Sequence, residues 1–166
     1  PCICYWTIFN EAWGQFDTEV AVDLTRRLDP TRLVNEASGG NYSLCGDIQD
    51  VHHYPGPAMN AFEGKMINVI GEYGGIGYPV EGHLWKISET NWGYGEVMSS
   101  GEQVLKLYEE FVEKLKLLAK TGVAAAVYTQ TTDVEVEVNG LITYDRKVVK
   151  VDEKRMAEIN RSLIEF

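Results

Sequence analysis

Two glutamates stand at the ends of apolar runs, and each lies beside aromatic residues. Glu11 follows Asn10 in "WTIFNEAWGQF", and Glu72 closes the run in "MINVIGEYGG". Retaining hydrolysis of a glycosidic bond needs two carboxyl groups that face each other across about 5–5.5 Å. One of the two must be kept protonated, and apolar surroundings favour that state. The two segments therefore indicate sugar chemistry, provided that the fold brings Glu11 and Glu72 together.

Short apolar runs alternate with amphipathic segments along the chain. We expect strands over residues 3–9, 32–37, 47–54, 66–72 and 123–130, and helices over 17–28, 100–120 and from 152 onward. Alternating strands and helices predict an α/β fold with a parallel sheet. Near-continuous apolar runs are typical of parallel strands that are covered on both faces.

Polar and aromatic residues collect at the carboxyl ends of the predicted strands. They are Asn10, Glu11, Ser38, His52, His53, Tyr54, Glu72, Tyr73, Tyr128, Thr129 and Gln130. In a parallel sheet these ends lie at one edge, where ligands bind in open sheets and in barrels. Trp13 follows Glu11, and Trp85 and Trp92 lie in a long glycine-containing loop. Flat rings of this kind suit the faces of sugars, and Trp13 is equally compatible with a packing role.

Composition limits the classes of partner. The formal net charge of −10 over 166 residues argues against nucleic acid, because phosphate binding needs a basic surface. No run of about 18 apolar residues occurs, so no membrane span is expected. No GxGxxG fingerprint follows a predicted strand, which argues against a dinucleotide. A carbohydrate substrate is favoured, with no cofactor, and the sequence leaves a divalent metal open.

The paired histidines suggest a metal site as an alternative. His52 and His53 lie close to Asp47 and Asp50 in the sequence. Adjacent residues of a strand point to opposite faces, so both histidines cannot easily bind one ion. We therefore expect one histidine to form hydrogen bonds and the other to pack.

The three cysteines show no spacing typical of zinc sites or disulfides. Cys2 and Cys4 lie in or beside the first apolar run and are interpreted as small buried side chains. A nucleophilic pair of Cys45 with His52 is conceivable, but no motif surrounds Cys45. We expect no catalytic cysteine.

Several segments resemble, in order, landmarks of glycoside hydrolase family 2, which includes β-galactosidases, β-glucuronidases and β-mannosidases. They are "WTIFNEAWGQFDTE", "LDPTRLVNEASGG", "GDIQDVHHYPGP", "GEYGG" and "YTQTTDVEVEVNGLITYDRK". The resemblance implies that Glu11 is the acid/base and Glu72 the nucleophile. It also implies that Asn10 contacts the sugar's 2-hydroxyl and that Tyr54 hydrogen-bonds the nucleophile.

The resemblance also implies a wall under the sugar from the last strand, where either Tyr128 or Gln130 is placed. From the residues themselves we add Trp13, His53 and the loop residue Trp92 as candidate substrate-binding side chains. No basic residue stands out there for a sugar carboxylate, which weakly favours a galactoside over a glucuronide.

The resemblance also implies the fold and its extent. We expect residues 1–166 to be the C-terminal portion of a (β/α)8 barrel, with strands four to eight over about 3–130 and a post-barrel segment and helix over about 131–166. Strands one to three are absent, so the open sheet edges would favour self-association or indicate a longer parent. The alternative function is a carbohydrate-binding or vestigial fragment that is inactive alone.

Overall fold

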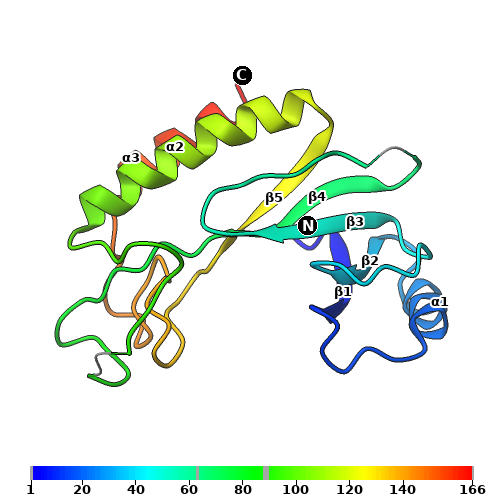
Figure 1. The fold of residues 1–166 in the computed structure, drawn as a ribbon, viewed down its shortest axis with the longest axis horizontal. Coiled ribbons are helices and arrows are strands. Elements are labelled where there is room, and N and C mark those ends of the chain that lie inside the picture. The colour runs from blue at the N-terminus through cyan, green and yellow to red at the C-terminus, as the bar shows by residue number, and fades with distance from the viewer. Residues whose placement is uncertain (1, 63, 88–89, 166) are drawn as a thin grey trace.

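The chain folds into two parallel sheets and three helices in the computed structural model, which describes residues 2–62, 64–87 and 90–165. The first sheet pairs β1 (Tyr5–Asn10) with β2 (Leu33–Ser38), and α1 (Thr18–Leu28) connects them. The second sheet has the order β3 (Ile48–His53), β4 (Ile67–Gly74), β5 (Val123–Thr129). The helix α2 (Gly101–Lys120) connects β4 to β5, and α3 (Glu153–Ser162) follows near the C-terminus. In Figure 1, α2 and α3 lie together along one side of the molecule, away from α1.

The prediction of a (β/α)8 barrel portion is wrong. The strands form two separate sheets, and the described residues close no barrel. No ladder joins β2 to β3 in the described part of the chain. Just before β3, Asp47 bonds Val34 through its N–H and its carboxylate, and side-chain bonds join Asn35 to Asp50 and Ser38 to His52. A barrel requires every neighbouring pair of strands to share a ladder, and a periodic pattern of strands and helices does not specify that closure.

The individual elements follow their sequence signals closely. All five expected strands and all three expected helices are present, with bounds shifted by one or two residues at most ends. Ser100 caps α2, since its hydroxyl accepts from the Gln103 N–H, and the Asp152 carboxylate caps α3 by accepting from the Arg155 N–H. Such side chains satisfy amide groups that have no partner within the helix.

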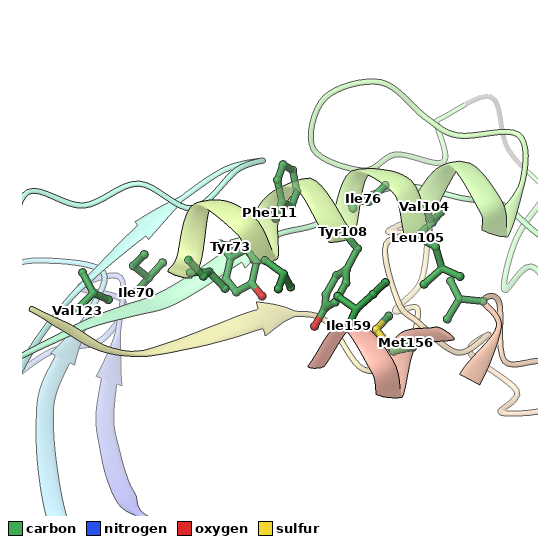
Figure 2. Close-up of a cluster of buried hydrophobic side chains, with 13 residues drawn as sticks. Ile70, Tyr73, Ile76, Val104, Leu105, Tyr108, Phe111, Val123, Met156 and Ile159 are labelled. Carbon is green, nitrogen blue, oxygen red and sulfur yellow. The ribbon is translucent and has the colours of Figure 1, made fainter. Parts of the chain in front are cut away.

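The main core lies between the second sheet and the helices α2 and α3. Figure 2 shows side chains from β4, α2 and α3 meeting in this layer. The buried cluster comprises Ile70, Tyr73, Ile76, Val104, Leu105, Tyr108, Phe111, Val112, Leu115, Val123, Val151, Met156 and Ile159. Since the apolar face of α2 covers β4 and β5, the carboxyl ends of these strands are held by a packed layer.

The prediction that Cys2 and Cys4 are buried is wrong. Both are exposed free cysteines, because the first strand begins only at Tyr5. The outer edges of β1 and β5 have no strand partner among the described strands. Self-association through these edges stays a prediction. Across the described residues no helix is both long and apolar enough to cross a membrane.

A buried carboxylate organises the loop that joins the two sheets. Glu36 is fully buried on β2, and its oxygens accept from the backbone N–H groups of residues 43–46, each at 2.7 Å. Burial acts to raise the pKa of Glu36, but hydrogen bonds from the Cys45 thiol and from backbone N–H groups outweigh burial and lower that pKa. Glu36 thereby fixes the chain that enters β3.

We expect Glu36→Gln to lower the free energy of unfolding by about 1.5–3 kcal/mol at neutral pH, the usual worth of hydrogen bonds to a charged group. Because the folded pKa lies below the ordinary value of 4.5, this stabilisation is present above that pH and is lost as the pH falls through the folded pKa. Urea unfolding of both proteins between pH 7 and pH 3 should show the difference shrinking in acid. Glu110→Gln, on the exposed side of α2, is the control; a difference independent of pH would contradict this role.

Candidate active site

Four strand ends meet at one imidazole. Glu11 follows β1, and its N–H donates to the Ser38 carbonyl at the end of β2, 2.9 Å away. His52 on β3 lies opposite Glu72 on β4 in the parallel register. Glu11, Ser38 and Glu72 all contact the His52 ring. The carboxyl ends of parallel strands thus form a common site, although they belong to two sheets.

Glu11 and Glu72 are close enough to act on one bond. One carboxylate oxygen of each and a ring nitrogen of His52 all lie within 4.8 Å of one another. The Glu11 side chain is 44% exposed and the Glu72 side chain 25% exposed. A substrate can therefore reach Glu11, while Glu72 is partly shielded from solvent.

Glu72 is held by a tyrosine hydroxyl. The Tyr54 O–H donates to Glu72 Oε2 at 2.5 Å. Burial, followed by the hydrogen bond to Glu72, raises the pKa of Tyr54 well above its usual range, and a hydrogen bond with Thr129 acts in the opposite direction. Tyr54 therefore remains a protonated donor at neutral pH, and it leaves Oε1 of Glu72 without this partner.

Aromatic rings form one wall of the site. Tyr54 stacks on Tyr94 with ring centroids 3.6 Å apart, and Trp92 contacts Tyr94 edge-on at 5.2 Å. Burial raises the pKa of Tyr94, and the carboxylates of Glu137, Glu11 and Glu72 raise it further. Tyr94 thus lies within reach of three acidic groups.

The remaining predicted residues differ in their partners and exposure. Asn10 ends β1, where its carbonyl accepts from the Trp13 N–H at 3.1 Å, and the Trp13 side chain is 80% exposed. Nδ1 of His53 lies 2.6 Å from the Gly56 carbonyl oxygen, and His53 is exposed. Gln130 donates from Nε2 to Asn139 Oδ1 at 2.8 Å.

Tyr128 belongs to the core rather than to the space around the carboxylates. Its ring packs edge-on against Tyr73 at 5.6 Å and against Tyr108 at 5.1 Å. Tyr73 follows Glu72 directly, so the two side chains point to opposite faces of β4. Since Tyr128 pairs in register with Tyr73, it shares the face covered by α2.

Sequence reasoning missed Tyr94, and it placed His52 and Thr129 at the strand ends without giving them a role in the site. For His52 a signal existed, because residues two apart on a strand share a face and Tyr54 was already assigned to the site. Tyr94 lies in a loop and carries no comparable signal. Thr129 contacts Tyr54 through a β4–β5 register that has two irregularities.

Glu11, His52 and Glu72 are also the one group among the described residues that could supply three metal ligands. Two carboxylate oxygens and an imidazole nitrogen suit zinc or manganese. The paired ligation by His52 and His53 considered above is not formed, since His52 faces the carboxylates and His53 faces Gly56.

The structural neighbours of this chain are glycosidases. A candidate β-galactosidase from Bacteroides fragilis superposes with a TM-score of 0.59 over 97% of this chain, at 18% identity. A Parabacteroides merdae β-glucuronidase superposes with a TM-score of 0.54 over 88% of this chain, at 16% identity. The chain spans about a quarter of their length, with 28% and 23% of them covered. No protein-family model and no curated protein matches the sequence, so the similarity is one of fold.

Proposed function

We propose that this chain carries the catalytic centre of a retaining β-glycoside hydrolase. The observation that carries the proposal is the position of Glu11 and Glu72, whose oxygens lie within 4.8 Å. That spacing fits double displacement, whereas an inverting site keeps its carboxyls about 6.5–9.5 Å apart to admit water. The glycosidase neighbours support the same class of reaction.

The proposed reaction proceeds in two steps. Oε1 of Glu72 attacks the anomeric carbon while the bond to the leaving oxygen breaks, and Glu11 transfers its proton to that oxygen. A glycosyl ester on Glu72 results. Glu11 then removes a proton from water, the resulting hydroxide attacks the anomeric carbon, and the ester bond breaks. Glu72 returns as a carboxylate and Glu11 as an acid.

A neutral sugar is the proposed substrate, with a galactoside favoured over a glucuronide. Glu11, Glu72 and Glu137 all act on Tyr94, so the aromatic wall lies in a negative field. No hydrogen bond or ion pair of the described residues brings a lysine or arginine to either catalytic carboxylate. A sugar carboxylate would meet repulsion here.

The neighbouring aromatic and polar residues are proposed to hold the sugar. Asn10 and Trp13 adjoin Glu11 in the chain, and Trp92 contacts Tyr94 of the aromatic wall. His53 ends β3, and Gln130 follows β5. We propose that residues 1–166 act as one unit, with the segment over 131–166 supporting the site through Glu137 and Asn139, whose side chains are 2.8 Å apart.

The second candidate function is carbohydrate binding without turnover. The observation that favours it is the openness of the site, since the Glu11 and Trp13 side chains are 44% and 80% exposed. Efficient hydrolysis benefits from excluding water around the reacting groups. Binding on exposed aromatic rings has no such requirement.

Trapping with activated 2-deoxy-2-fluoro glycosides separates the two functions. The fluorine slows release of the glycosyl ester, so intact-mass spectrometry should show an adduct of one sugar, and peptide mapping should place it on Glu72. We expect the galactoside reagent to react faster than the glucuronide reagent. Saturable sugar binding with no adduct would favour the binding module, and an adduct on another residue would contradict the assignment of the nucleophile.

A further inference from the structure

His52 is nearly buried at the centre of the site, with its side chain 8% exposed. Its Nδ1 lies 2.8 Å from Glu11 Oε1 and 3.4 Å from Glu72 Oε2. On the other side of the ring, Nε2 lies 2.8 Å from the Ser38 hydroxyl and 3.7 Å from Oδ1 of Asp50. The His52 ring therefore contacts both proposed catalytic carboxyls through Nδ1 and is held by the Ser38 hydroxyl at Nε2.

Gly39, directly after β2, leaves room for this ring because it has no side chain. Gly39 has a φ of +82°, and a Cβ at this position would lie 2.8 Å from both Nδ1 and Cε1 of His52. The Gly39 N–H also donates to Asp50. Any larger residue would displace the imidazole from the carboxyls, so the ring position is set by packing as well as by hydrogen bonds.

Hydrogen-bond chemistry decides what the ring does there. In the proposed pair Glu72 is ionised and only accepts, so Nδ1, which faces both Glu72 and Glu11, carries a proton. In the neutral ring Nε2 then accepts from the Ser38 hydroxyl. A donor on Oε1 of Glu11 leaves Oε2 as the oxygen that carries the acid proton. On Glu72, Tyr54 and His52 both lie at Oε2, which leaves Oε1 free to attack.

We propose that His52 is a positioning residue that assigns the working oxygen of both carboxyls: Oε2 of Glu11 as the proton donor and Oε1 of Glu72 as the attacking atom. This inference rests on the proposed function. The ring also joins the two sheets, since it comes from β3 and contacts the ends of β1 and β2. The carboxyl spacing thus depends on one side chain.

Two amide substitutions test the role atom by atom. His52→Asn places an amide nitrogen near the position of Nδ1, whereas His52→Gln places one near Nε2 and leaves the carboxyls without their donor. We expect kcat to fall about 100-fold in His52→Gln, the effect of a misplacement near 1 Å, and at least about 10 times less in His52→Asn. KM should change much less than kcat, because the His52 side chain is only 8% exposed and offers little surface to a substrate. Equal or reversed losses would overturn the proposal.

The dependence of the rate on the leaving group tests whether His52 positions both Glu11 and Glu72. In His52→Gln, hydrolysis of dinitrophenyl and methyl glycosides should both slow, since nucleophile and acid are both misplaced. A loss confined to the methyl glycoside would overturn the claim for Glu72. His83→Asn is the matched control, because His83 also binds a carboxylate through Nδ1, 2.9 Å from Asp145 Oδ2, outside the site. It should leave both rates unchanged.

A measurement without turnover separates this inference from the proposed function. Nitrogen-edited proton NMR should show a slowly exchanging Nδ1–H of His52, shifted by Glu11→Gln and by Glu72→Gln separately and unaffected by His83→Asn. If the signal behaves so while no glycoside is hydrolysed or trapped, the geometry stands and the function fails. If hydrolysis occurs and the signal ignores either glutamate, the positioning role is wrong.

Discussion

Glu72→Gln should reduce hydrolysis by a factor of about 10⁴ or more, because an amide cannot form the glycosyl ester. Glu72 already has one oxygen committed to the Tyr54 hydroxyl at 2.5 Å, and the exchange of O for NH₂ preserves its volume. We therefore expect the fold and the affinity for sugar to survive. Steady-state rates and the free energy of unfolding, measured together, would separate loss of chemistry from loss of structure.

Glu81→Gln is the matched control for this substitution, since Glu81 is an exposed glutamate in the loop after β4. It removes the same charge and should leave turnover unchanged. A Glu72→Gln protein that retains a substantial fraction of the activity would exclude Glu72 as the nucleophile.

Glu11→Gln should slow hydrolysis of glycosides with poor leaving groups by a factor of about 10²–10⁴, the usual contribution of general acid–base catalysis. A dinitrophenyl leaving group departs without a proton, so its release should continue until the glycosyl ester accumulates. The second step then lacks its base. Stopped-flow kinetics should show a burst of dinitrophenol followed by slow turnover.

Azide provides the control for this second substitution. As a small anion it attacks the glycosyl ester without a base, and the carboxylate that would repel it is gone. We expect azide to restore turnover in Glu11→Gln and to give a β-glycosyl azide, with no acceleration of the unsubstituted protein. Equal losses for all leaving groups, with no response to azide, would show that Glu11 is not the acid/base.

The meeting of polar side chains at the strand ends could be predicted because it depends on local signals. An apolar run predicts a strand, and the residue that follows it lies at the strand's end. The positions of Glu11, Glu72 and Tyr54 at strand ends follow from the sequence in this way. The caps at Ser100 and Asp152 are similarly local, since each is a short polar residue directly before a periodic segment.

The features that were predicted wrongly or missed depend on long-range geometry. Closure of a barrel requires each neighbouring strand pair to bond, and β2 and β3 do not form such a ladder. The pairing of side chains across two strands depends on register, and the register of β3 against β4 shifts between Val51 and His52, because Val51 pairs with Ile70 and His52 with Glu72. Pattern and composition do not encode that shift, so the pairing of His52 with Glu72 and the packing of Tyr128 against Tyr73 required coordinates.

The missing ladder between β2 and β3 affects the cooperativity of unfolding. The unit β1–α1–β2 carries Glu11, and the unit around β3, β4 and β5 carries Glu72, while side chains such as His52 and Asp47 make much of the connection. Regions joined by few backbone bonds open at a lower free energy than the packed core. We therefore expect denaturant to separate Glu11 from Glu72 at a lower concentration than the one that unfolds the layer beneath α2.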